Sequence, residues 1–199
     1  MNTDVVTHYD LLIDEGNDPV NDPKSLQKYM DKWDGQPFID ALCLDKTKSV
    51  LEIGVGTGRL AIRIAPLCKH FTGVDISPKT IEKAYQHLKK NNNVTLICGD
   101  YTTHNFDTNY DVIYSSLTWM HIQNKQFAID KTVDLLNAAG RFVLSISKDQ
   151  SNAIDFGTRK IAIYPDNPES TETGMKNSGL VIVRKIQTEN AYIFISEKR

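Results

Sequence analysis

The stretch V-L-E-I-G-V-G-T-G-R-L, from Val50 to Leu60, decides the fold of this 199-residue chain. A short apolar run carries an acid at Glu52, three glycines follow at alternate positions, and a segment compatible with a helix begins after them. A strand that turns through glycines into a helix lets the backbone approach a ligand with no side chain in the way. The stretch therefore predicts a ligand site at a strand-to-helix turn. Its members are Gly54, Val55, Gly56 and Gly58.

The charge of Glu52 distinguishes two kinds of ligand for this turn. A turn that binds the pyrophosphate of a dinucleotide usually has the spacing G-x-G-x-x-G, whereas this chain has G-x-G-x-G. Glu52 would face that pyrophosphate, and two like charges ~4 Å apart repel by ~4 kcal/mol at an intermediate effective dielectric constant. A cationic ligand reverses the sign of this interaction, so the sequence favours a positively charged ligand.

Strand patterns and helix patterns alternate from residue 49 onward. The strand patterns cover 49–53, 70–75, 94–98, 110–116 and 141–147, and the helix patterns cover 58–67, 78–90 and 124–137. This alternation predicts an α/β fold in which helices cover both faces of a mostly parallel sheet. The last two strand patterns, 180–186 and 191–195, are joined by a connection so short that it predicts an antiparallel hairpin.

The chain is expected to form a single domain, residues 1–199. Its length and its hydrophobic content of 40% suit one core. Residues 46–199 would form the α/β core with its C-terminal hairpin, and residues 1–45 would form a helical or lid segment. Within that segment, the acidic residues 9–22 are interpreted either as a solvated loop or as a mobile lid over a cleft.

Helices are also expected at 23–33 and 37–44, where Asp22 and Pro23 would begin the first and Asp34-Gly35 would end it. The long crossover 148–179 is weakly patterned, with one short helix expected near 170–176.

The composition argues against nucleic acid or a membrane as a partner. The formal net charge is −2, so no long-range attraction to nucleic acid or to an anionic membrane is expected. The first residues show no signal-like pattern, and no apolar run approaches ~20 residues. Cys43, Cys68 and Cys98 are interpreted as reduced core thiols rather than zinc ligands. A cytoplasmic protein with no metal site is therefore expected.

Three acids lie where predicted strands end, at Glu52, Asp75 and Asp100. In an open parallel sheet, ligands bind at the carboxyl ends of the strands. An acid that ends the second strand is the usual partner of ribose hydroxyls, because one carboxylate accepts from both. Asp75 fits this role, and Asp100 is placed to accept from the exocyclic amine of adenine. Each acid is a weak signal alone, but the three acids and the glycine turn together are a strong one.

Four segments carry a resemblance to a known family. They are V-L-E-I-G-V-G-T-G, F-T-G-V-D-I-S, L-I-C-G-D and Y-D-V-I-Y-S-S-L-T-W-M-H-I. In order and spacing they resemble the successive motifs of the class I S-adenosylmethionine-dependent methyltransferases, over about residues 49–147. The resemblance implies a three-layer α/β/α Rossmann-like sandwich, a seven-stranded sheet of order 3-2-1-4-5-7-6 with strand 7 antiparallel, and S-adenosylmethionine as cofactor.

The resemblance also implies which residues hold each part of the cofactor. The turn at Gly54 and Gly56 would face its amino-acid part, and Asp75 would hold the ribose. Asp100 would bind the adenine amine, and Ser116 would lie near the methionyl end. The full cofactor set is Glu52, Gly54, Val55, Gly56, Gly58, Asp75, Ile76, Asp100, Tyr101 and Ser116.

The residues after the fourth strand favour a small-molecule substrate. Residues 115–118, S-S-L-T, differ from the N-P-P-Y type motif of the DNA and protein-glutamine amino-methylating enzymes, and the stretch L-T-W-M-H-I looks like that of small-molecule methyltransferases. Methyl transfer to oxygen or nitrogen chiefly needs alignment and exclusion of water, without a metal.

His121 is the candidate general base, with a structural role at the next helix as the alternative. Tyr9, Tyr29, Trp119 and Arg159 are candidate substrate-binding residues, although each also fits ordinary packing or solvation. Arg59 and Arg63, spaced i, i+4, are expected to face solvent.

Two other functions stay open at this point. One is a nicotinamide-dependent Rossmann enzyme, which the acid before the G-x-G-x-G turn disfavours. The other is a cofactor-binding module without catalysis, which no feature of the sequence excludes.

Overall fold

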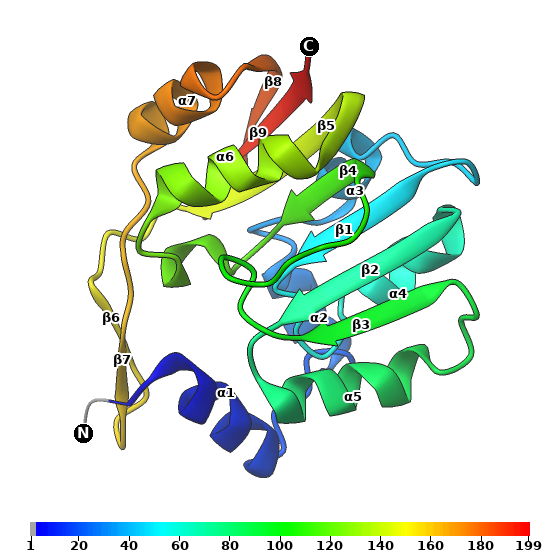
Figure 1. Ribbon diagram of the computed structural model, residues 1–199. Coiled ribbons are helices and arrows are strands. Elements are labelled where there is room, and N and C mark those ends of the chain that lie inside the picture. The colour runs from blue at the N-terminus through cyan, green and yellow to red at the C-terminus, as the bar shows by residue number, and fades with distance from the viewer. Residues whose placement is uncertain (1–2) are drawn as a thin grey trace.

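The computed structural model describes residues 3–199, and a seven-stranded sheet lies at its centre (Figure 1). The strands are β1 (Ser49–Ile53), β2 (His70–Asp75), β3 (Val94–Cys98), β4 (Tyr110–Ser115), β5 (Leu136–Ser147), β8 (Leu180–Gln187) and β9 (Ala191–Lys198). They lie in the order β3-β2-β1-β4-β5-β9-β8. β9 pairs antiparallel with β5 and β8, and the first five strands pair in parallel. The predicted strand order and the antiparallel seventh strand are confirmed.

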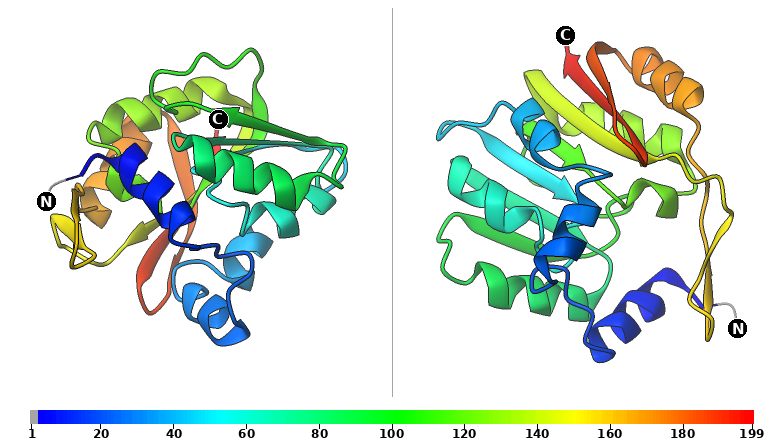
Figure 2. Two further views of the ribbon diagram at one scale, coloured as in Figure 1. Left: turned by 90° about the horizontal axis from the view of Figure 1, so that it is seen from below. Right: turned by 180° about the vertical axis from the view of Figure 1, so that it is seen from behind.

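Helices cover both faces of this sheet (Figure 2). One face carries α3 (Gln36–Ala41), α4 (Ala61–Ile64) and α5 (Pro78–Leu88), and the other carries α6 (Lys125–Leu135) and α7 (Pro168–Asn177). Successive strand residues point to opposite faces, so Val50 lies in the same core cluster as Phe38 of α3, and Leu51 lies with Ile129 of α6. Each face therefore has its own apolar core, and the predicted three-layer sandwich is confirmed.

Two boundaries in the core and one additional hairpin differ from expectation. α4 begins at Ala61 rather than at 58, because Gly58 still belongs to the turn and has a φ of +97°. β5 begins at Leu136 rather than at 141, with an irregular register where Tyr110 and Val112 pair with it. The crossover contains an unexpected hairpin, β6 (Ala153–Asp155) and β7 (Lys160–Ala162). Strands this short carry no usable periodicity.

The N-terminal segment differs more strongly from expectation. Residues 5–14 form a helix, α1 (Val5–Asp14), where a loop was one interpretation of residues 9–22. The Asp4 side chain accepts from the Thr7 amide at 2.9 Å and so caps the helix. The solvated-loop interpretation is therefore wrong for residues 9–14. α2 (Lys24–Met30) and α3 are also shorter than the expected helices at 23–33 and 37–44.

Contacts on two sides hold α1 across the end of the sheet (Figure 1). Towards α5, Asp10 accepts from the Ser77 hydroxyl at 2.7 Å. Towards the β6–β7 hairpin, Arg159 donates to Glu15 and to His8. α1 is thus a docked helix that joins two distant parts of the chain. Within residues 3–199, no helix has both the length and the apolar character that crossing a bilayer requires.

Candidate functional site

A cavity of about 690 Å³ opens at the carboxyl ends of β1, β2, β3 and β4. Its lining comes from the glycine turn after β1, from the loops after β2, β3 and β4, and from α1 and the first turn of α6. A parallel sheet has its binding crevice at this edge, where the strand order reverses between β1 and β4. The cavity is therefore the candidate site, and its volume lies in the range of small-molecule sites.

The glycine turn needs glycine at Gly54 for two reasons. Gly54 has a φ of +77°, which side chains disfavour, and a Cβ atom there would lie 1.9 Å from the Thr118 hydroxyl. The next glycine, Gly56, has a φ of +56° and donates its backbone N–H to Asp75 at 2.9 Å. The turn after β1 is therefore fixed by the acid that ends β2.

The two acids at the strand ends lie in different hydrogen-bonding surroundings. Glu52 is buried and accepts from the Tyr114 hydroxyl at 2.8 Å. Burial raises the pKa of Glu52 to about 8, against smaller opposing contributions from Tyr114 and Arg59. Burial also raises the pKa of Asp75, although the backbone N–H groups of Ser77 and Gly56 oppose that rise. A cation in the cavity would favour the ionised form of both acids.

Glu52 is expected to make the fold less stable at high pH. Its folded-state pKa of about 8 exceeds the unfolded value of 4.5, so stability falls as pH rises from about 4.5 through about 8. Glu52→Gln keeps an acceptor for Tyr114 without the charge. At pH 9 the variant should be more stable than the parent by a few kcal/mol, because each unit of pKa difference corresponds to roughly 1.4 kcal/mol. At pH 5 the stabilities of the two proteins should be nearly equal. Urea unfolding at both pH values measures this difference in the free energy of unfolding. The same difference at pH 9 and at pH 5 would contradict the prediction.

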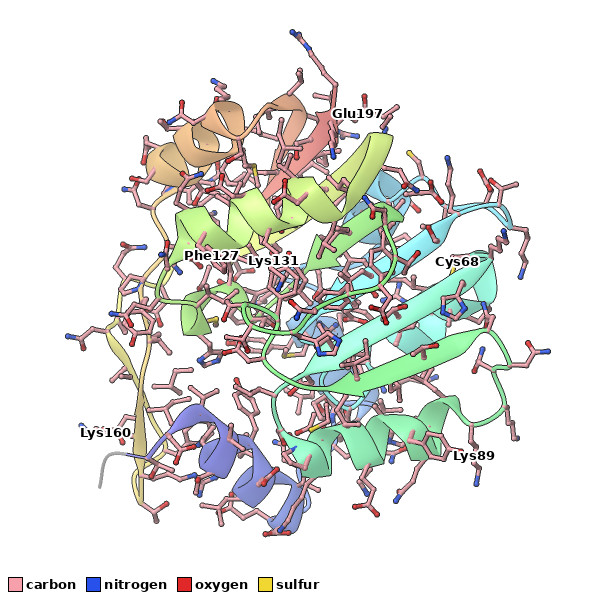
Figure 3. All side chains as sticks on the ribbon, in the orientation of Figure 1. Cys68, Lys89, Phe127, Lys131, Lys160 and Glu197 are labelled. Atoms are coloured by element: carbon pink, nitrogen blue, oxygen red, sulfur yellow. The ribbon has the colours of Figure 1, made fainter. Side chains whose placement is uncertain are left out.

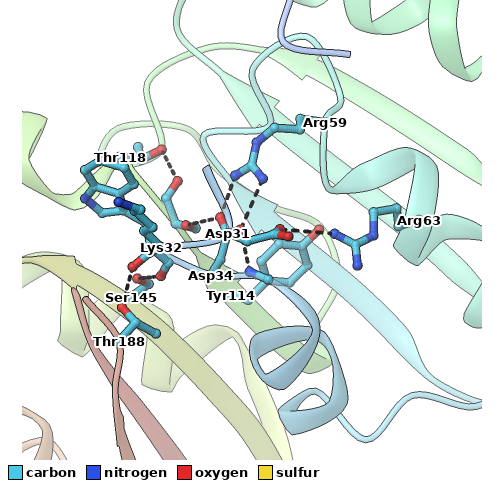
Figure 4. A network of polar contacts seen from close by, with 12 residues as sticks. Asp31, Lys32, Asp34, Arg59, Arg63, Tyr114, Thr118, Ser145 and Thr188 are labelled. Carbon is cyan, nitrogen blue, oxygen red and sulfur yellow. Dashed lines mark hydrogen bonds and ion pairs between the residues drawn. The ribbon is translucent and has the colours of Figure 1, made fainter. Parts of the chain in front are cut away.

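A buried polar network behind the glycine turn centres on Asp34 (Figure 4). Arg59 donates both terminal nitrogens to the Asp34 carboxylate, and the Ser116 hydroxyl donates to it at 2.8 Å. The Asp34 side chain is fully buried, and that of Arg59 is 17% exposed. The expectation that Arg59 faces solvent is therefore wrong, whereas Arg63 is more exposed. The network joins the loop before α3 to the turn after β1 and to the end of β4.

His121 and Tyr9 form a hydrogen-bonded pair that lines the cavity. The Tyr9 hydroxyl lies 2.8 Å from His121 Nε2, and His121 Nδ1 is enclosed with no partner among the described residues. Burial is the main reason why the pKa of His121 falls to about 4. Burial also raises the pKa of Tyr9. At neutral pH the pair is thus an uncharged imidazole beside a protonated phenol.

The structure gathers most of the residues singled out from the sequence around this one cavity. Those that line it are Glu52, Gly54, Val55, Gly56, Asp75, Ile76, Asp100, Tyr101, Ser116, Tyr9 and His121. Four others lie elsewhere. Gly58 faces Leu88, and Tyr29 is an exposed residue whose ring packs edge to face with Trp33. Trp119 is buried against Phe142, and Arg159 is paired with Glu15. Their contacts are with the fold rather than with the cavity.

Sequence reasoning missed part of the lining. The missed residues include Val5, Met30, Arg59, Leu117, Thr118, Ile122 and Phe127. A signal existed for Leu117 to Ile122, because they follow directly on β4. Met30 comes to the cavity only through the tertiary fold, and no local pattern marks it. No group of three or more potential metal ligands occurs within residues 3–199.

The fold and the site define a Rossmann-like domain with an acid-lined crevice, and comparisons with known proteins narrow this class. A family model described as "Methyltransferase domain" matches residues 50–140. The malonyl-[acyl-carrier protein] O-methyltransferase of Priestia megaterium is 35% identical over 102 residues, which are 49% of this chain and 36% of that protein. A second O-methyltransferase of this name, from Ilyobacter polytropus, is matched over 38% of its length. The chain thus spans little more than a third of these relatives.

Solved structures show the same fold at low sequence identity. The N-methyltransferase NodS from Bradyrhizobium japonicum, in complex with S-adenosyl-L-homocysteine, aligns with a TM-score of 0.64 and 20% identity over 91% of this chain and 99% of that one. Magnesium protoporphyrin IX methyltransferase from Synechocystis, with bound S-adenosylmethionine, gives a TM-score of 0.68 and 19% identity over 87% and 79%. Residues 50–140 of this chain thus match the methyltransferase domain model, and the chain has the fold of these methyltransferase structures.

Proposed function

We propose that the protein is an S-adenosylmethionine-dependent methyltransferase that methylates an oxygen or nitrogen of a small molecule. The observation that carries this is the crevice itself, in which Glu52, Asp75 and Asp100 line one cavity around the glycine turn. These acids suit a cofactor with a sulfonium and an ammonium group and oppose a pyrophosphate. The relatives named above are methyltransferases, which supports the proposal.

The residues fit the parts of S-adenosylmethionine in order along the cavity. Asp75 would accept from the ribose hydroxyls, with Ile76 against the adenine. Asp100 and Tyr101 would hold the adenine end; Asp100 already accepts from the backbone and hydroxyl of Thr102, both at 2.7 Å. At the other end, the backbone of Gly54 and Gly56 would face the amino-acid part. The further members of this set are Glu52, Val55, Ser116 and, from the structure, Arg59.

The bound cofactor supplies a methyl carbon already activated by its sulfonium, so the protein's task is alignment and proton handling. With Tyr9 protonated and His121 neutral, the phenol can donate to His121 Nε2 while its oxygen accepts from the acceptor's O–H or N–H. The acceptor's proton then moves to the Tyr9 oxygen as the phenol proton moves to His121 Nε2. A base with a pKa of about 4 takes up a proton late, once methylation has made the acceptor strongly acidic.

Removing either member of this pair should slow methyl transfer with little effect on cofactor binding. Tyr9→Phe and His121→Gln are each expected to lower kcat by about 10²-fold or more, the usual scale for a lost proton-transfer group. Because His121 acts as its neutral form, activity should stay level from about pH 8 down to about pH 5 and fall towards pH 4. A kcat within threefold of the parent, or a His121-dependent fall near pH 6.5, would contradict the relay.

One pair of measurements tests the proposed function as a whole. Isothermal titration compares S-adenosylmethionine, S-adenosylhomocysteine and NAD, and mass spectrometry follows release of S-adenosylhomocysteine with pools of small hydroxyl and amino compounds. Binding of S-adenosylmethionine but not of NAD, followed by methyl transfer, is the expected result. Binding of NAD alone would end the proposal. Tight binding of S-adenosylmethionine without transfer to any pool would indicate a cofactor-binding module.

We also propose the finer features that accompany this activity. Residues 1–45 would act as a lid segment on a single-domain enzyme, which the position of Tyr9 on α1 supports. A cytoplasmic location is supported by the free thiols of Cys43, Cys68 and Cys98. Cys68 is buried, but Cys43 and Cys98 are exposed, so their interpretation as core residues is wrong. The net charge of −2 supports a small-molecule acceptor over nucleic acid.

A further inference from the structure

The two walls of the cavity differ sharply in charge. Among the lining residues within 3–199, the charged ones are Glu52, Arg59, Asp75 and Asp100. Glu52 and Asp75 lie in the last residues of β1 and β2, and Arg59 and Asp100 follow β1 and β3, all on the wall proposed for the cofactor. The opposite wall comes from α1, from the loop after β4, from the start of α6 and from the crossover. Its residues, which we call the acceptor wall, are Val5, Tyr9, Leu117, His121, Ile122, Gln123, Asn124, Phe127 and Tyr164.

Two aromatic side chains of the acceptor wall are strongly exposed for their type. Phe127, labelled in Figure 3, lies in the first turn of α6. Its side chain is 49% exposed, and Tyr164 is 38% exposed. The backbone N–H of Tyr164 donates to the Met120 carbonyl at 2.8 Å, which fixes the crossover beside the loop after β4. Large apolar side chains left open at the mouth of a cavity mark a surface that a ligand covers.

The cations that flank the acceptor wall are already paired. Lys125 follows the wall residue Asn124, and its ammonium group lies 2.6 Å from the Asp166 carboxylate and also donates to the Trp119 carbonyl. Arg159 contacts His8, next to Tyr9, and donates both terminal nitrogens to Glu15. An acceptor with a carboxylate or a phosphate would thus meet no available counter-charge on this wall, and burying an unpaired charge is strongly unfavourable.

We propose that the methyl acceptor is a mainly aromatic or alicyclic molecule without an acidic group, whose reacting hydroxyl or ring nitrogen contacts Tyr9 and His121 on the acceptor wall. The apolar body would lie against Leu117, Ile122 and Phe127, and a hydroxyl or ring nitrogen would reach the Tyr9 oxygen. This inference rests on the proposed function. It also goes beyond that function, because it excludes acceptors that carry an acidic group.

Three naphthols that differ at the 6-position test this inference. The probes are 2-naphthol, 6-hydroxy-2-naphthoic acid and 6-(aminomethyl)-2-naphthol, titrated calorimetrically into the protein saturated with S-adenosylhomocysteine. The acidic probe is expected to bind at least about tenfold more weakly than either of the others, since only its carboxylate is buried without a counter-charge. Equal affinities, tightest binding of the acidic probe, or binding of none of the three would overturn the inference. Binding of S-adenosylhomocysteine is measured first and by itself, so its failure would identify the proposed function as the part that is wrong.

A charge placed on the acceptor wall should change this preference in a predictable direction. Phe127→Lys is expected to raise the affinity for 6-hydroxy-2-naphthoic acid by about fivefold or more and to lower that for 2-naphthol. Tyr85→Lys is the matched control, because Tyr85 is a 68% exposed aromatic on α5 that does not line the cavity. Both variants should keep the parent's affinity for S-adenosylhomocysteine, which verifies that they fold. Unchanged affinities for both naphthol probes in Phe127→Lys, or the same change in Tyr85→Lys, would overturn the inference.

Discussion

Asp34→Ala is expected to lower the free energy of unfolding by about 3–5 kcal/mol, the usual cost of removing one partner from a buried ion pair. The Asp34 carboxylate accepts from both terminal nitrogens of Arg59, from the Ser116 hydroxyl and from the Gly35 backbone N–H. Its loss leaves a mostly buried guanidinium without a counter-charge. For a domain of this size the melting temperature should fall by roughly 6–20 °C.

A matched control and a double variant separate the causes of this effect. Asp31→Ala removes an acid from the same region. Asp31 is half exposed, and its carboxylate comes no closer than 4.0 Å to Arg63. Its loss is therefore expected to lower the free energy of unfolding by about 1 kcal/mol or less. Asp34→Leu combined with Arg59→Met removes both charges and should be less destabilising than Asp34→Ala. Equal melting temperatures for Asp34→Ala and Asp31→Ala would show that the network contributes little to stability.

Asp75→Ala should lower the affinity for S-adenosylmethionine by about 10²–10³-fold. The proposed ribose contacts are charge-assisted hydrogen bonds, each worth about 1.5–3 kcal/mol, and a factor of ten in affinity is about 1.4 kcal/mol. The same carboxylate also accepts from the backbone of Gly56 at 2.9 Å and of Ser77 at 3.0 Å. The variant therefore loses the ligand's contacts and the anchoring of the glycine turn together.

Calorimetry with two further variants makes the result specific to this position. Asp75→Asn keeps one acceptor and the shape of the side chain, so its affinity should lie between those of the parent and Asp75→Ala. Asp107→Ala removes an exposed acid outside the cavity and should bind as the parent does. If Asp75→Ala binds S-adenosylmethionine within about threefold of the parent's affinity, the change in binding free energy is less than about 1 kcal/mol. That result would exclude Asp75 from the cofactor site.

The parts of the site that the sequence predicted correctly depend on short spacings along the chain. The glycine turn, the acids at the ends of β1 and β2, and the closing hairpin each occupy a few consecutive residues, so propensity and periodicity suffice to find them. The order of the strands came from the resemblance, because pairing between distant strands leaves no local pattern.

The parts that were missed depend on pairing between distant residues. Asp34 lies 25 positions before Arg59 and 82 positions before Ser116. No local sequence pattern around these residues predicts the network. Arg159 was a candidate for substrate binding, but the docking of α1 brings Glu15 and His8 to it. Trp119 follows a motif that faces the cavity, yet its own side chain turns into the core against Phe142.

The matched family domain covers residues 50–140, whereas Tyr9 on α1 and Tyr164 in the crossover lie outside it. The segment that matches the family model thus contains the glycine turn and the strand-end acids, and residues outside it supply part of the acceptor wall. A match over residues 50–140 therefore bears on the proposed cofactor side of the cavity more than on the proposed acceptor side.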